Sequence, residues 1–295
     1  MINSIILKIK FFMVCPLIFL RIMPQISKEL IKKLNLLRSF LKDKKVIVAF
    51  SGGVDSSLLA YLSNKYAKKT LLLTAKSILI STDEIEEAKQ FANNHNITHR
   101  EIIVNPLENE KFAKNPKNRC YICKKELFSN FVMIKQNENY DLIIDGSNAD
   151  DIVDFRPGME ALKELNIESP YIFFDINKQD VRDLSQHFNL DTYSKPSSAC
   201  LASRIPYTQE ITKKKLQMIN KAEKFLKEQF NLTQLRVRYH EDRLARIEFP
   251  LDEIPRILNP KILREIKAKL KELGFIYITI DVEGFRSGSL NETLN

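Results

Sequence analysis

Short apolar runs alternate with amphipathic stretches over the first two thirds of the chain. The runs predict strands buried on both faces, at residues 46–50, 70–75, 99–104 and 141–145. Apolar residues at helical spacing predict helices in the stretches around them, at residues 25–41, 58–66, 81–92, 115–134 and 177–188. A further strand is expected over residues 170–175. Together they predict an α/β fold, a parallel sheet with helices on both faces.

The pattern changes near Ile205 and Pro206. The remaining residues predict two helices and three strands, in the order helix 212–229, strands 234–240 and 244–249, helix 251–273 and strand 275–282. This is the signature of a small α+β domain. We therefore expect a ligand-binding α/β domain over residues 23–205, whose ligand the motifs below identify, and a small second domain for substrate binding or oligomerisation over residues 206–295.

The first 22 residues are apolar but do not predict a membrane span. Charged residues and Pro16 interrupt them, and the longest uncharged run, residues 11–20, is too short to cross a bilayer. No small-residue cleavage site supports a signal peptide. We interpret residues 1–22 as an extension upstream of a true start at Met23, and expect no membrane partner and a cytoplasmic location.

Charge distribution and cysteine content argue against a nucleic-acid-binding protein and against a disulfide-rich secreted protein. The chain has a net charge of +9, but residues 1–45 alone carry +8, and residues 46–205 carry −3. A nucleic-acid surface on the core is therefore disfavoured, and we expect no nucleic-acid partner. Four cysteines in 295 residues indicate metal or redox chemistry in a reducing compartment rather than a disulfide framework.

The strongest motif joins the first strand to the following helix. Strand, glycine turn and helix follow one another in VIVAFSGGVDSS, residues 46–57. The helix N-terminus favours phosphate, and the turn lacks the lysine of a Walker A loop. A carboxylate here requires a cation, most simply Mg²⁺, to approach a phosphate. The candidate phosphate-binding residues are Ser51, Gly52, Gly53, Asp55, Ser56 and Ser57, and the resemblance of SGGVDS to the PP-loop of the ATP pyrophosphatase superfamily implies that the phosphate is that of ATP.

A second acidic cluster follows the fourth predicted strand. Residues 145–151, DGSNADD, lie at the same carboxyl edge of a parallel sheet as the glycine turn. Asp150 or Asp151 could therefore share a metal with Asp55, and Asp151 is the tentative Mg²⁺ ligand. The alternative is an ordinary solvated turn.

Three cysteines form a second candidate centre. Cys120 and Cys123 make a C-x-x-C pair, and Cys200 follows 77 residues later, with Lys195 and Arg204 near it in sequence. Zinc in a structural site takes four ligands, and the four histidines show no matching spacing. Three thiols can hold a [4Fe–4S] cluster with one open iron. A redox pair and inert buried thiols remain alternatives.

Arg236 and Arg238 lie on one face of a predicted strand, where paired guanidinium groups suit carboxylate or phosphate; an ordinary half-exposed strand is the alternative. The combined motifs resemble the LarE family of PP-loop sulfur transferases from about residue 25 onward. SGGVDSS alone resembles the wider ATP pyrophosphatase superfamily. The narrower match lies in NRCYICKKELF, DGSNADD, DFRPGMEAL, KPSSACLASRIP, LRVRYH and GFRSGSLNETL.

The resemblance implies a reaction on pyridinium-3,5-biscarboxylic acid mononucleotide, in the route to the nickel-pincer nucleotide of lactate racemase. ATP adenylates a carboxylate, and a sulfur donor then converts it to a thiocarboxylate. In one branch of the family the residue matching Cys200 gives up its own sulfur and becomes dehydroalanine. In another branch, three cysteines hold a [4Fe–4S] cluster that carries sulfide.

Because Cys120, Cys123 and Cys200 are all present, the resemblance favours the cluster branch. It also assigns the substrate's carboxylate or phosphate to Arg236 and Arg238. The expected partners are this small-molecule nucleotide, sulfide or another sulfur donor, and further copies of the chain in a homo-oligomer. Two other functions remain open: a PP-loop tRNA thiolase, which requires a basic RNA surface, and a nucleotide-sensing module, which binds ATP without releasing pyrophosphate.

Overall fold

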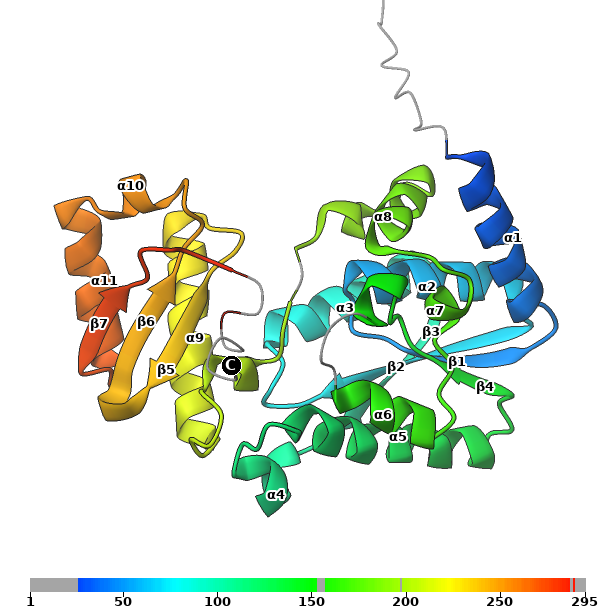
Figure 1. Ribbon diagram of the computed structural model, residues 1–295, viewed down its shortest axis with the longest axis horizontal. Helices are drawn as coiled ribbons and strands as arrows, with labels where there is room; N and C mark the ends of the chain where they lie inside the picture. The colour runs from blue at the N-terminus through cyan, green and yellow to red at the C-terminus, as the bar shows by residue number, and fades with distance from the viewer. Residues whose placement is uncertain (1–25, 153–156, 197, 287–288, 290–295) are drawn as a thin grey trace, which may run out of the picture.

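The computed structural model describes residues 26–152, 157–196, 198–286 and Ser289. The predicted extension of residues 1–22, residues 154–156 of the DFRPGMEAL motif and most of the final RSGSLNE motif lie outside the described residues. Two lobes, each built on its own sheet, stand side by side (Figure 1). No helix in the described part of the chain is long and apolar enough to cross a membrane.

The larger lobe is built on four parallel strands, as the alternating pattern predicts. The strand order is β3-β2-β1-β4. Val46 on β1 pairs with Thr70 on β2 and with Leu142 on β4, which places the carboxyl ends of these strands at one edge. The strands are β1 (Lys45–Ala49), β2 (Lys69–Lys76), β3 (Thr98–Ile103) and β4 (Leu142–Ile144).

Helices cover both faces of this sheet (Figure 1). Val46 and Val48 pack into a core with α1 (Lys28–Leu41), α2 (Val54–Tyr66), α3 (Thr82–Asn94), α7 (Pro170–Phe173) and α8 (Lys178–His187). Ile47, pointing to the opposite face, packs with α5 (Arg119–Asn137) and α6 (Pro157–Glu164). Burial on both faces explains why β1 is continuously apolar. Shorter elements are α4 (Glu110–Ala113), η1 (Pro106–Glu108), η2 (Ala149–Ile152), η3 (Asp191–Ser194) and η4 (Leu201–Arg204).

The smaller lobe contains the predicted α+β pattern. Strand β6 (Leu244–Glu248) pairs antiparallel with β5 (Arg236–His240) and parallel with β7 (Tyr277–Ile280). Val237 and Tyr239 face the core shared with helices α9 (Lys213–Phe230) and α11 (Pro260–Glu272). Leu201 and Ala202 of η4 join that same core. Two short elements, α10 (Ile254–Ile257) and η5 (Glu241–Arg243), complete this lobe.

Two expected elements differ from the structure. Where a strand was expected over residues 170–175, the chain forms the short helix α7 (Pro170–Phe173), since Pro170 occupies its first turn, where a missing N–H costs nothing. The expected helix over residues 251–273 is divided into α10 and α11, because Asn259 caps a new helix that starts at Pro260. The division into two domains at residue 205 stays a prediction.

Candidate active site

The loop between β1 and α2 has the geometry that its glycines predict. Gly52 has φ of +71°, and a Cβ there would lie 3.1 Å from the Cβ of Ala88 on α3. Glycine satisfies both constraints. The hydroxyl groups of Ser51 and Ser56 lie 3.1 Å apart, and no described side chain caps α2 at Gly53. The open N–H groups at this helix end favour a phosphate.

Asp55, in the first turn of α2, is held by residues that follow β4. Its Oδ1 accepts a hydrogen bond of 3.2 Å from Asn148 Nδ2, and its Oδ2 forms an ion pair with Lys178 of α8. The hydroxyl of Tyr171 donates to the Asp55 backbone carbonyl at 3.2 Å. Burial, followed by the nearby charge of Asp55, raises the pKa of Tyr171 well above its usual value, so this hydroxyl stays a donor.

The acidic cluster after β4 orders the loop around Asp55. Asp150 accepts from the backbone N–H of Lys178 at 2.9 Å, and Asp151 accepts from the N–H of Asn148 at 3.0 Å. Within the described ranges, no group of three His, Cys, Asp or Glu side chains has the spacing needed to hold a metal ion. A metal shared by Asp55 and Asp151 therefore stays a prediction.

A cavity of about 460 Å³, which we name the phosphate-loop cavity, lies at the carboxyl edge of the large sheet. Ser57 does not line it, because this side chain is fully buried beneath the loop residues that do. The cavity extends from the phosphate loop to Cys200, the third cysteine. Its polar lining includes Ser51, Asp55, Ser56, Asp145, Asp151 and Cys200.

The three cysteines line a second, mainly apolar cavity of about 220 Å³, which we name the cysteine cavity. Cys120 and Cys123 lie in the first two turns of α5, and Cys200 closes the space from the segment before η4. Burial, followed by the neighbouring thiols, raises the pKa of Cys123 to about 12. Burial also raises the pKa of Cys120, although the residue remains open to solvent along one side. Without a bound cation, Cys123 is therefore a neutral thiol at physiological pH.

The segment leading to Cys200 is tied to the phosphate loop. Lys195 donates to the Gly52 carbonyl at 2.9 Å and pairs with Glu87 on α3, so its charge is directed away from Cys200. Beyond the cysteine, Arg204 donates to the Cys200 carbonyl at 3.1 Å and pairs with Glu223 on α9. Both cations therefore bind backbone carbonyls and carboxylates. Cys200 itself lines both the phosphate-loop cavity and the cysteine cavity.

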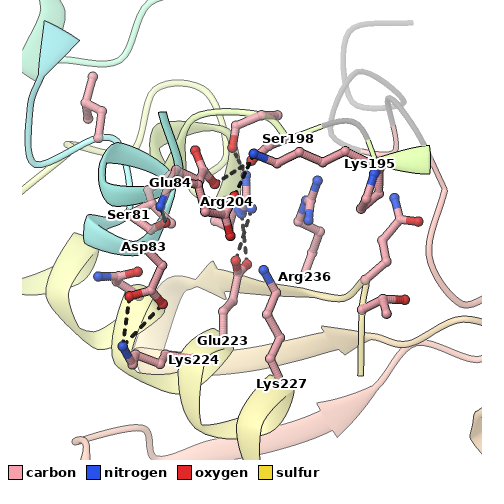
Figure 2. A pocket seen from close by; sticks show the side chains of 18 residues that line it. Ser81, Asp83, Glu84, Lys195, Ser198, Arg204, Glu223, Lys224, Lys227 and Arg236 are labelled. Atoms are coloured by element: carbon pink, nitrogen blue, oxygen red, sulfur yellow. Dashed lines mark hydrogen bonds and ion pairs between the residues drawn. The ribbon is translucent and has the colours of Figure 1, made fainter. Parts of the chain in front are cut away.

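A third cavity of about 360 Å³ lies between the lobes and contains charges of both signs (Figure 2). Arg236 lines it, and burial followed by the charge of Arg204 lowers the pKa of Arg236 to about 10. On the other side Asp83 and Glu84 begin α3, and Asp83 pairs with Lys224 of α9. Anionic groups of a ligand would meet Arg236 here.

Arg238 has different surroundings from Arg236. Its guanidinium donates to both carboxylate oxygens of Glu248, at 2.9 and 2.8 Å, and Glu248 is fully buried. Further donation reaches the Ser203 carbonyl at 2.8 Å and the Ser289 hydroxyl at 2.7 Å. The structure therefore brings Arg236, but not Arg238, to the lining of the third cavity.

Comparison with known proteins establishes the family. The asparagine synthase family matches residues 37–241. A relative from Lactiplantibacillus plantarum named pyridinium-3,5-bisthiocarboxylic acid mononucleotide synthase is 32% identical over 267 residues, covering 89% of this chain and 95% of the relative. The chain belongs to the LarE family. An uncharacterised protein of Synechocystis is 38% identical over 264 residues, covering 89% of this chain and 98% of the relative. A GMP synthase subunit of Archaeoglobus fulgidus shares 22% identity over 211 residues, which cover 65% of this chain and 67% of the relative.

Membership in this PP-loop family makes the chain an ATP-dependent enzyme. Four residues of its site were not singled out from sequence: Asn148 and Lys178 at Asp55, Tyr171 beneath them, and Arg119 in the cysteine cavity. Asn148 could have been found, because it lies within the predicted acidic cluster. Lys178 begins an ordinary amphipathic helix and carries no signal, since its role depends on how α8 packs.

Proposed function

We propose that this LarE-family enzyme uses ATP to adenylate a carboxylate of pyridinium-3,5-biscarboxylic acid mononucleotide and converts it to a thiocarboxylate. One observation carries the proposal: the phosphate-loop cavity includes both Asp55 and Cys200. An acyl adenylate formed beside the loop would lie within the same space as a sulfur atom. The printed activity of the Lactiplantibacillus plantarum relative supports this choice of substrate.

Adenylation is assigned to the phosphate loop. A carboxylate oxygen of the substrate attacks the α-phosphorus of ATP, the bond to the β-phosphate breaks, and pyrophosphate leaves. The N-terminus of α2 and the hydroxyls of Ser51 and Ser56 bind the departing pyrophosphate. Mg²⁺ fits Asp55, since this ion commonly uses one or two protein carboxylates together with phosphate oxygens, and it would neutralise phosphate charge there. Lys178 must first release the carboxylate.

Substrate binding is assigned to the cavity between the lobes. Arg236 lines that cavity and accounts best for recognition of a phosphate or carboxylate of the nucleotide. Arg238 supports Arg236 indirectly, because its pairing with Glu248 holds strand β5 against β6. The Cys200 segment borders this cavity through Ser198 and Ala199, so a substrate can reach from Arg236 towards the phosphate loop.

Sulfur transfer is assigned to the cysteine cavity. Attack of a sulfur nucleophile on the acyl carbon expels AMP and leaves the thiocarboxylate. Cys120, Cys123 and Cys200 line one space, and three thiolates of this kind can each bind a different iron of a [4Fe–4S] cluster. When bound, such a cluster supplies a fourth iron that can accept an added sulfide. If no cluster is held, Cys200 itself is the sulfur donor. Its Sγ attacks the acyl carbon to form a thioester as AMP leaves, and loss of the Cα proton of Cys200 then breaks the Cβ–Sγ bond, which releases the thiocarboxylate and leaves dehydroalanine.

The test separates adenylation from sulfur transfer. Cys200→Ala is expected to keep substrate-dependent exchange of pyrophosphate into ATP and to lose replacement of oxygen by sulfur in the product, measured by mass spectrometry. Loss of exchange in a folded Cys200→Ala protein would contradict the assigned order. Iron and acid-labile sulfide are measured on protein purified without oxygen. An iron-free protein whose Cys200 loses its sulfur after one turnover would establish the sacrificial route.

A further inference from the structure

The cavity between the lobes meets the phosphate-loop cavity at one carboxylate. Among the described residues, three line both cavities: Glu84, Ser198 and Ala199. Glu84 is the charged member of this set, and it lies in the first turn of α3. A ligand that extends from Arg236 into the phosphate-loop cavity therefore passes the Glu84 side chain.

Glu84 differs from the other carboxylates of the cavity between the lobes, because each of those has a cationic partner. Their ion pairs measure 2.6 to 3.0 Å and join Asp83 to Lys224, Glu87 to Lys195 and Glu223 to Arg204. Within the described ranges, no lysine, arginine or histidine forms an ion pair with Glu84. Its carboxylate accepts a hydrogen bond of 2.6 Å from the neutral hydroxyl of Ser198. Glu84 therefore presents a negative charge that no ion pair neutralises, at the boundary of the two cavities.

The local structure directs this carboxylate to the cavity wall rather than to the helix cap. Ser81, the N-cap of α3, accepts from the backbone N–H of Glu84 at 3.2 Å. In a capping box, the side chain of a glutamate at this position would bond back to the N-cap residue. Here the side chain bonds Ser198, in the segment that leads to Cys200. The position of the charge therefore depends on the cavity wall and not on the cap.

The opposite side of the cavity carries positive charge. Arg236 of β5 and Lys227 of α9 line it from the smaller lobe, and Glu84 lies on the side of α3 (Figure 2). A ligand that matches this arrangement has an anionic group at one end and a positive charge further along. A pyridinium mononucleotide has that order: phosphate, ribose, the positively charged ring nitrogen and then the ring carboxylates. With its phosphate at Arg236 and a carboxylate at the phosphate loop, its ring nitrogen lies at the boundary that Glu84 occupies.

We propose that Glu84 is a specificity-determining residue, which faces the positive ring nitrogen of the substrate and selects a pyridinium ring over an uncharged ring. The inference rests on the proposed function, which assigns the two ends of the substrate to the two cavities. Attraction between a carboxylate and a cation is stronger in a partly closed cavity than in water. An uncharged ring of the same outline gains nothing from this charge.

The experiment compares two nucleotides that differ in ring charge. Pyridinium-3,5-biscarboxylic acid mononucleotide and its dihydro form, whose ring is uncharged, are titrated by calorimetry at neutral pH without ATP into protein purified without oxygen. The wild type is expected to bind the pyridinium form about 10-fold more tightly, the scale of a close charge pair at a binding interface. Glu84→Gln keeps an acceptor for Ser198 and should remove this preference by weakening only the pyridinium form. Asp83→Asn is the matched control and should keep the preference, because Asp83 lines the same cavity but is paired with Lys224.

Three results would each overturn the inference. They are equal affinity of the wild type for the two nucleotides, an unchanged preference in Glu84→Gln, and an equal loss of affinity for both nucleotides in that variant. The last result would assign Glu84 to the ribose hydroxyls that both nucleotides share. If Glu84→Gln fails to fold, Glu84→Asp decides: a smaller preference is expected because the charge retreats by one methylene, and an unchanged preference counts against Glu84.

Pyrophosphate exchange with the pyridinium nucleotide, measured on the same wild-type preparation, keeps the two proposals apart. Exchange without a preference for the charged ring removes only the role of Glu84. A preference that depends on Glu84, in a protein that shows no exchange, removes only the proposed function.

Discussion

The phosphate-loop cavity and the cysteine cavity share Cys200 but differ in how their charges are balanced. In the first, Asp55 already has a cationic partner in Lys178, and Asp151 accepts a backbone hydrogen bond. In the second, the buried guanidinium of Arg119 has no carboxylate partner within the described chain. A cation that binds Asp55 in the first cavity must therefore displace Lys178, whereas the guanidinium in the second contacts the neutral Asn115 side chain and the Tyr207 ring.

Removing the carboxylate of the phosphate loop should have the largest effect. Asp55→Ala is expected to lower pyrophosphate exchange by about 100-fold or more, because charge at the transferred phosphate is no longer neutralised. Sulfur transfer should fall equally, since it follows adenylation. Asp175→Ala is the control, because Asp175 is an exposed carboxylate at the end of α7. Full exchange activity in Asp55→Ala would show that Asp55 binds no catalytic metal.

A paired and an unpaired buried arginine should respond differently to mutation. Arg238→Met should lower the free energy of unfolding by about 3 kcal/mol, because it leaves the buried Glu248 without its main partner. Arg119→Gln should cost clearly less, since it leaves no buried carboxylate behind. Urea denaturation of both variants gives the comparison. Equal losses would mean that Arg119 is held mainly for stability.

A substitution of Lys178 tests whether Mg²⁺ must displace this lysine from Asp55 in the phosphate-loop cavity. If Lys178 competes with Mg²⁺ for Asp55, then Lys178→Met should lower the Mg²⁺ concentration for half-maximal exchange by up to about 5-fold, the scale of a partly exposed ion pair. Lys33→Met, which removes another lysine paired with α8, is the control. A rise in the Mg²⁺ requirement would instead indicate that Lys178 binds phosphate.

Acid should weaken the sheet beneath the phosphate-loop cavity by a smaller amount. His99 bonds Thr74 Oγ1 at 2.8 Å and packs against Phe50, and burial lowers its pKa below the usual 6.5. The unfolded chain thus takes up a proton first, and stability present above pH 6.5 is lost as the pH falls below it. The urea midpoint should decrease between pH 7.5 and 5.5.

His99→Gln should flatten that pH dependence, although not completely, because burial also lowers the pKa values of His95 and His240. The substitution keeps a side-chain group able to bond Thr74. An unchanged slope in this variant would assign the acid sensitivity to the other histidines rather than to the strand under the phosphate loop.

Patterns among residues that are close together in the sequence predicted most of the strands and helices of the large lobe. The apolar run of residues 46–50 and the following glycines contain the strand, the turn and the helix start within twelve residues, so neighbouring residues suffice. The strand expected over residues 170–175 was wrong, because hydrophobicity does not separate a short buried helix from a short strand. The division between α10 and α11 depends on a cap that the longer apolar pattern hides.

The sequence by itself determined the family, the phosphate loop and the three cysteines, because each depends on residue type and short spacing. Only the tertiary structure decided which charges are already paired. Arg236 and Arg238 are two residues apart and identical in chemistry, yet one lines a cavity and the other is bound to Glu248 across the strand pair. Likewise, the contact of Arg119 with the Tyr207 ring and the pairing of Lys178 with Asp55 arise from side chains that meet only when distant segments pack together.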